Sequence, residues 1–372
     1  MSTSHVVWLD ACDADSAPRV GGKALGLGLL LRDGLQVPPG FVVTTDAYVE
    51  GTQTTGLQAK IAAILDGADT METQQVASEQ IKVLFEAEEL AGPVAEEVAA
   101  AYRRLCGVTA LDVPVAVRSS ATAEDRADAS FAGQQETYLW IRGAADVDRH
   151  ILRCWASLFT PQAIAYRAHL GVPLEGLAMA VVVQRMVAAE SAGVMITLDP
   201  VTGDRSQISI ESSYGLGLAV VGGEVTPDRF AVDKVTWNIR SRVIGPKTFA
   251  YRFDPASGSV VTQDIPPDDQ AMPSMTDEEV IILARLGRQV EKANGGPQDV
   301  EWAIGPGAEG PRELFLLQMR PETVWSRKKV ASISDPNEDI LSRMLKAMSQ
   351  PMRLRDAPPD DADGAPTGDA FR

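Results

Sequence analysis

The segment VPVAVRSSATAEDRADASFAGQQETYLW, residues 113–140, joins a short apolar run to a loop of small residues. β-Branched residues dominate its first five positions, so we predict a β-strand over residues 113–117. Arg118 follows at the end of that strand, and the stretch SFAGQQET comes after an acidic patch. Whether the segment is a binding site depends on the partners that the rest of the chain supplies.

The overall composition predicts a globular protein without a nucleic-acid-binding surface. The 372 residues suffice for two or more domains or for one large two-lobed unit. Hydrophobic residues make up 45% and charged residues 23%, which indicates a folded core. The net charge of −17 argues against non-specific binding of nucleic acid, which needs a basic protein surface. ATP remains a suitable ligand if basic residues gather in one cleft and magnesium accompanies the phosphates.

The cysteines and the N-terminus predict a cytoplasmic location. Cys12, Cys106 and Cys154 are odd in number, far apart and in no CxxC spacing. Disulfide frameworks and zinc sites are therefore not expected. The N-terminus has no basic segment followed by an apolar one, and no run approaches the roughly 20 apolar residues of a membrane span. We expect a soluble, cytoplasmic protein.

Helical and strand patterns both occur along the chain and predict an α+β fold. Leu25, Leu29 and Leu30 recur at helical spacing, and Thr276 with Glu279 forms a capping box ahead of an amphipathic pattern. The Pro-, Gly- and Asp-rich end of the chain is predicted to be disordered. The predicted helices lie before Asp33-Gly34, within residues 58–105, and at residues 276–292 and 335–348, and the other predicted strands at residues 41–45, 178–187, 193–198, 207–212, 299–304 and 314–319.

Two glycine-rich stretches do not match the common nucleotide-binding motifs. A Walker A loop around Gly22-Lys23 would need a glycine at position 17 and a Ser or Thr at position 24, and both positions hold alanine. GLGLLL at residues 26–31 and GLGLAV at residues 215–220 lack the third glycine of a dinucleotide-binding fingerprint. The chain therefore has neither standard loop.

Four polar residues near the end of the predicted fold form the patterns D-x-E and Q-x-R, namely Asp299, Glu301, Gln318 and Arg320. Residues two apart in a strand share a face, so a pairing of the two strands would gather all four side chains on one patch. Glu and Gln oxygens suit magnesium, and an adjacent arginine suits a phosphate. This combination predicts a nucleoside triphosphate site without a P-loop.

Several stretches, taken together, resemble the ATP-binding domain shared by phosphoenolpyruvate synthase, pyruvate phosphate dikinase and rifampicin phosphotransferase. The resemblance covers roughly residues 20–325 and implies an ATP-grasp-like fold with the nucleotide between two lobes. The implied N-terminal lobe is residues 1–190 and the C-terminal lobe residues 191–327, followed by a short helix and an acidic tail in residues 328–372. The matching stretches are GGKALGLGLLL, VPPGFVVTTDAY, VAVRSSATAED, SFAGQQETYL, VVVQRMV, AGVMITLDPVTGD, ESSYGLGLAVVGGEVTPDRF, DVEWAI and LQMRPET.

The resemblance implies a phosphate-binding side of the cleft. Lys23 and Arg118 would contact the phosphates of ATP, and Arg320 would steady the phosphoryl groups in transfer. Gly133 and Thr137 would lie in the loop that closes over those phosphates. Closure of such a loop expels water and strengthens each charge contact.

The same resemblance implies an adenine hinge and a metal site. Gln184, with the backbone around Met186, would lie at the hinge between the lobes. Glu301 and Gln318 would hold Mg²⁺, with Asp299 as a weaker candidate. ATP and Mg²⁺ are thus the expected cofactors.

Full-length members of this family transfer phosphate through a histidine on a swivelling domain. His5, His150 and His169 are the histidines of this chain, and none has the Gly-, Thr- and Ser-rich surroundings of a carrier histidine. We therefore expect the carrier and acceptor domains to be absent, so that ATP phosphorylates a histidine on a separate partner protein and leaves AMP and phosphate. The partner would bind the small-molecule acceptor, and no nucleic acid or membrane is expected to take part.

The identity of the final acceptor has two interpretations. A phenol or cresol, as in phenylphosphate synthase, is favoured, and pyruvate, as in a split phosphoenolpyruvate synthase, is consistent with the same residues.

A function other than phosphotransfer is also considered. A non-catalytic ATP-sensing or scaffold subunit is one such alternative. An autonomous ATP-grasp ligase is another, and it would release ADP instead of AMP.

Overall fold

A five-stranded antiparallel sheet, in the order β1-β2-β5-β3-β4, forms the first layer of the fold. Strand β5 lies within the predicted run AMAVVVQRMV, residues 178–187, and occupies the centre of this sheet. Six of its seven residues are buried because elements cover both of its faces. The strands are β1 (Val6–Trp8), β2 (Gly40–Val43), β3 (Val115–Ala121), β4 (Thr137–Ile141) and β5 (Met179–Arg185).

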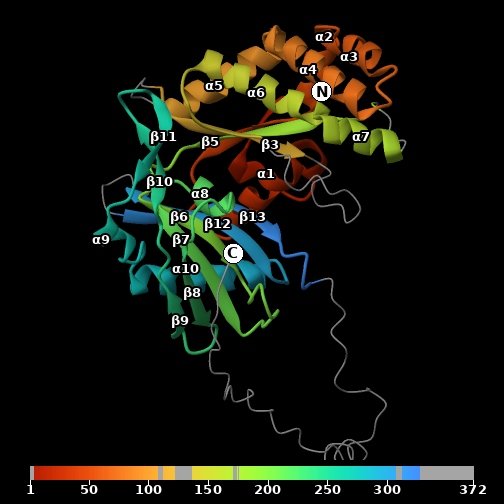
Figure 1. Cartoon of the computed structure of the whole chain (residues 1–372). Coiled ribbons are helices and arrows are strands. Elements are labelled where there is room, and N and C mark those ends of the chain that lie inside the picture. The colour runs from red at the N-terminus through yellow and green to blue at the C-terminus, as the bar shows by residue number, and fades with distance from the viewer. Residues whose placement is uncertain are drawn as a thin grey trace, which may run out of the picture. The chain divides into compact units, whose positions relative to one another are not determined.

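A layer of helices covers one face of this sheet (Figure 1). Val181 and Val183 of β5 point into this helical layer, whereas Val182 belongs to the core on the opposite face. The alternation follows from the two-residue period of a strand. The helical segments predicted within residues 58–105 are confirmed. The layer consists of α2 (Thr45–Thr54), α3 (Leu57–Leu65), α4 (Met71–Glu86), α5 (Gly92–Cys106), α6 (Ala144–Ala156), the 3₁₀ turn η3 (Ser157–Phe159) and α7 (Pro161–Leu170).

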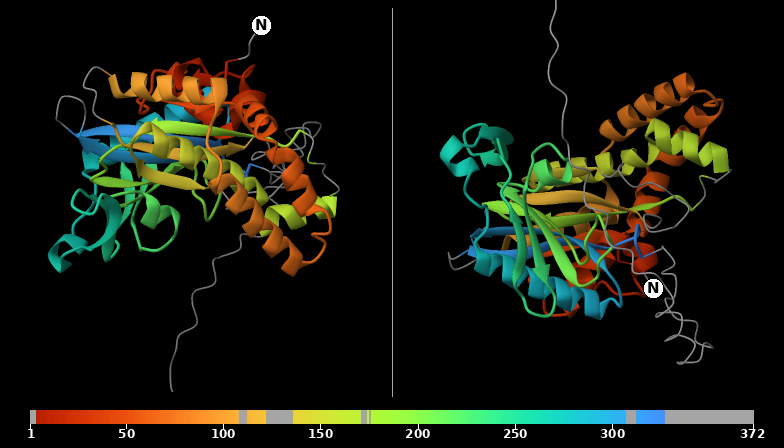
Figure 2. Two further views of the ribbon diagram at one scale, coloured as in Figure 1. Left: turned by 90° about the horizontal axis from the view of Figure 1, so that it is seen from above. Right: turned by 60° about the horizontal axis from the view of Figure 1, so that its bottom comes forward.

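A second antiparallel sheet of six strands, in the order β13-β12-β6-β7-β8-β9, forms the other half of the fold. Helix α10 (Asp277–Ala293) runs along one of its faces and contacts four of its strands (Figure 2). The predicted capping box is confirmed, because Thr276 and Glu279 exchange hydrogen bonds at the start of α10. The strands are β6 (Ser191–Ile196), β7 (Gln207–Tyr214), β8 (Asp228–Asp233), β9 (Ile239–Val243), β12 (Gln298–Pro306) and β13 (Arg312–Pro321).

Smaller elements accompany the two sheets. A two-stranded hairpin, β10 (Phe249–Asp254) with β11 (Ser259–Asp264), projects from this half, and its Phe253 stacks on Trp140 of β4 with ring centroids 4.1 Å apart. The remaining elements are the 3₁₀ turn η1 (Leu9–Ala11), α8 (Leu218–Val221) and α9 (Pro267–Gln270).

Helix α1 (Ala17–Arg32) packs against strands of both sheets. Of the three leucines that the helical spacing singled out, only Leu30 is buried; the buried residues include Val20, Ala24 and Leu27 instead. Close packing on β13 is the reason, since a Cβ at position 26 would press against the carbonyl of Met319. Small residues therefore face the sheet, and one continuous core joins α1 to both sheets.

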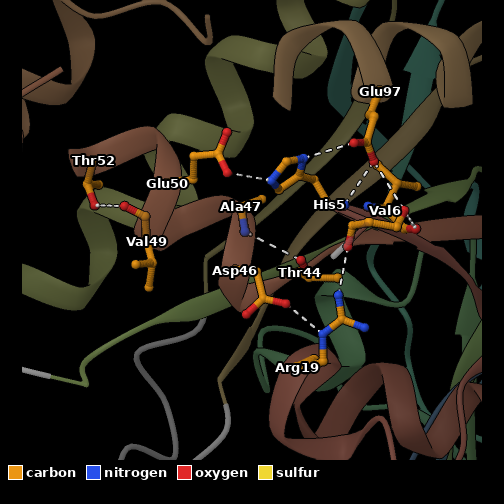
Figure 3. A network of polar contacts seen from close by, with 11 residues as sticks. His5, Val6, Arg19, Thr44, Asp46, Ala47, Val49, Glu50, Thr52 and Glu97 are labelled. Atoms are coloured by element: carbon orange, nitrogen blue, oxygen red, sulfur yellow. Dashed lines mark hydrogen bonds and ion pairs between the residues drawn. The ribbon is translucent and has the colours of Figure 1, made fainter. Parts of the chain in front are cut away.

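The N-terminal segment is tied to the helical layer by a buried histidine (Figure 3). Nδ1 of His5 lies 2.9 Å from a carboxylate oxygen of Glu97 in α5, and Nε2 lies 3.0 Å from one of Glu50 in α2. Nearby, Nε of Arg19 in α1 donates to Asp46 of α2 at 2.6 Å. These contacts anchor β1 and the start of α1 against α2 and α5.

In this computed structural model the described residues are 4–107, 112–121, 136–170, 174, 176–306 and 312–326, and they belong to one compact unit, Met1–Arg327. The observed architecture is α+β, as predicted. Within the described part of the chain, no helix is long and apolar enough to cross a membrane. The predicted helix at residues 335–348 and the predicted disordered tail lie outside the described residues. The proposed boundary between lobes at residue 190 stays a prediction.

Candidate nucleotide-binding site

A cavity of about 160 Å³ lies between the two sheets. Strands β3, β4 and β5 contribute to its wall from the first sheet, and β6, β12 and β13 from the second. Most of the wall is apolar, and the polar side chains in it include Arg118, Thr137, Gln184 and Glu301. An apolar pocket with a few converging polar groups is the usual form of a small-molecule site.

Arg118 of β3 crosses from the first sheet to the second. Its Nη1 donates to the carbonyl of Leu317 at 2.9 Å, and its Nη2 donates to Glu301 Oε2 at 2.8 Å and to Gln318 Oε1 at 2.7 Å. The side chain is 11% exposed, and its Nε is buried without a hydrogen-bond partner. The strand predicted to end before Arg118 continues to Ala121, so this arginine lies inside β3; it reaches the cavity with one donor left unsatisfied for a ligand oxygen.

Strands β12 and β13 pair, and the pairing gathers the D-x-E and Q-x-R side chains as expected. Glu301 lies opposite Gln318 and Asp299 opposite Arg320, so all four side chains share one face. Arg320 binds Asp299 through Nε at 2.8 Å and through Nη2 at 2.7 Å. Burial raises the pKa of Asp299, and the positive charge of Arg320 partly offsets that rise. Asp299, Gln318 and Arg320 adjoin the cavity without being part of its wall.

Lys23 lies beside the strand that carries Arg118. Its Nζ donates to the carbonyl of Ser119 at 2.7 Å, and the residue is 5% exposed. Helix α1 is kinked shortly before this lysine, at Gly21, which adopts φ 76° and ψ 171°, a conformation that is nearly restricted to glycine. Ser120 bridges the kink, because its hydroxyl donates to Val20 O at 2.8 Å and accepts from Ala24 N at 3.3 Å. Lys23 is not a wall residue of the cavity.

The residues expected at the hinge and closing loop are partly described. Thr137 lies opposite Arg118 in the β3–β4 pairing and contributes to the cavity wall. Gln184 and Met186 also contribute, with the Gln184 amide donating to Pro38 O at 3.1 Å and Met186 N to Pro114 O at 2.9 Å. Gly133 lies outside the described residues.

Part of the apolar wall was not predicted from the sequence. Leu216, Gly217 and Leu218 come from the GLGLAV stretch that failed as a dinucleotide motif, and Val221 follows that stretch. Leu218 is 38% and Val221 is 58% exposed. Exposed apolar residues in a glycine-rich segment would have indicated a binding surface. Their exposure could not be predicted from the sequence, because it depends on the fold.

The residues present fit a magnesium ion that is bound together with phosphates. Glu301 Oε2 and Gln318 Oε1 converge on a single nitrogen of Arg118, so the two oxygens already point to one spot. Among the described residues, no group of three or more His, Cys, Asp or Glu side chains could hold a metal by itself. Mg²⁺ commonly uses one or two protein oxygens and completes its shell with phosphates and water, which agrees with this donor set.

The histidines lie away from the cavity wall. His5 is enclosed by two carboxylates, and His150 of α6 has its Nδ1 2.7 Å from Asp146 O. Burial lowers the pKa of His150. His169 is exposed on α7. None of the three contributes to the wall of the cavity.

The chain belongs to the family of the pyruvate phosphate dikinase AMP/ATP-binding domain, whose sequence model matches residues 17–339. It is 41% identical over 366 residues to the phosphoenolpyruvate synthase of Aeropyrum pernix, which covers 91% of this chain and 45% of that protein. It is 40% identical over 347 residues to a probable phosphoenolpyruvate synthase of Methanocaldococcus jannaschii, covering 92% of this chain and 29% of that protein. The resemblance inferred from the sequence is confirmed. The chain spans less than half the length of these relatives.

Proposed function

We propose that this chain binds Mg-ATP in the cavity between the sheets, as the ATP-binding catalytic part of a two-protein phosphotransferase. In this reaction a pyrophosphoryl group passes to a histidine of a separate carrier protein and leaves AMP, with phosphate released later. The observation that carries the proposal is the convergence of Arg118, Glu301 and Gln318 beside an apolar cavity. Two sheets that face each other across that cavity support an ATP-grasp-like arrangement, with residues 1–190 and 191–327 as its lobes.

The cationic residues of the site would bind and neutralise the phosphates. Arg118 can release its present partners and offer a planar fork of donors to phosphate oxygens. Lys23 adds a second positive charge next to the same strand, and Arg320 is held in place by Asp299. Thr137, opposite Arg118, would begin the return from a closing loop that includes Gly133. Fixed charges in a water-poor cleft stabilise developing charge more strongly than water does.

The apolar part of the cavity would hold the adenine. Gln184 and the backbone at Met186 would contact the base from β5, and Leu216 and Leu218 would cover it from the second half. Glu301 and Gln318 would hold Mg²⁺, and Asp299 is a weaker ligand candidate because it already pairs with Arg320. When bound, the ion would neutralise charge on the phosphate oxygens. The chain itself would position the reactants and exclude water.

The acceptor histidine is proposed to come from another polypeptide. His5 has both ring nitrogens bonded to carboxylates and is 3% exposed, so it cannot approach a phosphate without breaking both contacts. His150 is held within α6, and His169 lies on the helical layer. The positions of these three side chains support an acceptor histidine that lies outside residues 1–372.

The final acceptor is proposed to be pyruvate. The relatives that match most of this chain are named as phosphoenolpyruvate synthases or probable phosphoenolpyruvate synthases. A phenol or cresol acceptor stays a prediction that these names do not support.

Product analysis with a histidine-bearing partner tests the proposal. The chain is mixed with ATP labelled at the β-phosphate, with and without that partner. We expect AMP and an acid-labile phosphohistidine on the partner only in the complete mixture. Release of AMP by this chain alone, with label on a small molecule, would contradict a separate carrier. ADP as the product would favour an autonomous ligase, and unchanged turnover after Arg320→Ala would favour a scaffold.

A further inference from the structure

Glu301 and Gln318, the two proposed metal ligands, both accept hydrogen bonds from the guanidinium of Arg118. Nη2 of Arg118 lies 2.8 Å from Glu301 Oε2 and 2.7 Å from Gln318 Oε1. Nη1 of the same guanidinium is held by the carbonyl of Leu317 at 2.9 Å. The Arg118 and Glu301 side chains are 11% and 26% exposed, so water screens this pair only partly.

A magnesium ion and this guanidinium cannot use the two oxygens at the same time. Mg²⁺ binds oxygen at about 2.1 Å, so an ion bound to both oxygens would lie almost in contact with Nη2 of Arg118. The two positive charges would repel strongly in this partly buried place. Metal binding therefore requires Arg118 to leave Glu301 and Gln318.

Phosphate is the ligand class that would draw Arg118 away. The buried Nε of Arg118 has no partner in the present arrangement, so the guanidinium does not satisfy all its donors on the second sheet. A phosphate group accepts several hydrogen bonds from one guanidinium fork and adds opposite charge. When Arg118 binds phosphate, phosphate oxygens replace its three present partners, which are the Glu301 carboxylate, the Gln318 amide and the Leu317 carbonyl. The oxygens of Glu301 and Gln318, which face the same point, are then free to bind a metal.

We propose that Arg118 guards the metal site: it occupies Glu301 and Gln318 until a nucleotide takes its guanidinium, so that metal binding depends on nucleotide. This inference rests on the proposed function and adds an order to the assembly of that site. Free divalent cation would then bind poorly, and nucleotide and metal would raise each other's affinity by the same factor. The apparent metal affinity is then the intrinsic affinity multiplied by the fraction of molecules in which Arg118 no longer binds Glu301 and Gln318.

Titration with Mn²⁺, followed by the loss of its free electron-paramagnetic-resonance signal, tests the guard on the full chain. The wild type should bind Mn²⁺ weakly alone and at one site when a non-hydrolysable ATP analogue is present. Arg118→Met should gain a nucleotide-independent Mn²⁺ site about tenfold tighter or more than the wild type. Arg229→Met is the matched control, because Arg229 also pairs with a carboxylate, Glu211, in the same sheet at 3.7 Å. That control removes the same charge and should leave Mn²⁺ binding unchanged.

Three outcomes would contradict the proposal that Arg118 blocks the metal site. The first is a wild type that binds Mn²⁺ alone as tightly as with the analogue. The second is a folded Arg118→Met that gains no Mn²⁺ site. The third is an equal gain in Arg229→Met, which would indicate bulk charge instead of a specific exchange. A wild type that binds Mn²⁺ tightly without nucleotide contradicts the proposal even if Arg118→Met does not fold, whereas support for it requires the Mn²⁺ site gained by a folded Arg118→Met. Calorimetric titration with the analogue alone distinguishes failure of the proposed function from failure of the proposal about Arg118. Absence of nucleotide binding would refute the proposed function itself.

Discussion

Arg118→Met is expected to lower kcat/KM of the partner-dependent phosphotransfer by about 10³-fold, the scale seen when a charged donor to a transferring phosphoryl group is removed. The guanidinium reaches the cavity from the first sheet and bonds the two proposed metal ligands of the second. Methionine keeps the length and apolar stem of the side chain but supplies neither charge nor donors. The loss should fall mainly on kcat, because the apolar wall that would hold the adenine is left intact.

Steady-state kinetics at saturating partner, with ATP varied, would measure this effect. Arg118→Lys keeps the charge but not the planar fork, so its activity should fall between the wild type and Arg118→Met. Thermal unfolding of each variant shows whether the fold survives the change. A folded Arg118→Met with activity within threefold of the wild type would contradict the role assigned to this arginine.

Asp228→Ala is expected to reduce the free energy of unfolding by about 3–5 kcal/mol, because it leaves a buried lysine charge without its carboxylate. Asp228 and Lys247 are both 0% exposed, and Lys247 Nζ lies 2.6 Å from Asp228 Oδ1. The carboxylate also accepts from Gly245 N at 3.0 Å and from both N and Oγ of Ser274 at 2.7 Å. It thus joins the start of β8 to two loops that precede β10 and α10.

Urea unfolding followed by circular dichroism would measure the loss. Arg149→Ala is the control, since it breaks an ion pair with Asp146 whose side chains are 57% and 48% exposed. Such exposed pairs contribute about 1 kcal/mol or less. Equal shifts of the unfolding midpoint in the two variants would show that the buried network does not stabilise the fold as argued.

The sequence allowed prediction of the elements whose residues carry a local pattern. Strand periodicity places Asp299 and Glu301 on one face, as it does Gln318 and Arg320, and the observed pairing of β12 with β13 brings all four together. The capping box at Thr276 and the apolar run of β5 were likewise local signals. Arg118 was predicted at the end of a strand, but it lies inside β3 (Val115–Ala121), and its bonds to Glu301 and Gln318 were not predicted.

Other features depend on contacts between distant segments and could not be predicted locally. The kink at Gly21 exists because Ser120, about 100 residues away, fills the space where a side chain would stand. The buried face of α1 is set by the close approach of β13, which no helical periodicity reveals. The wall contributed by Leu216 and Leu218 depends on how the second half folds against the first.

Photolabelling with 8-azido-ATP tests most directly whether the cavity between the sheets holds the nucleotide. We expect saturable labelling of the tryptic peptides of residues 186–205 or 206–229, which contain the wall residues Val187, Ala192 and Leu218. Excess ATP should abolish that label. Saturable labelling confined to another part of the chain, such as the helical layer at residues 45–106, would contradict it.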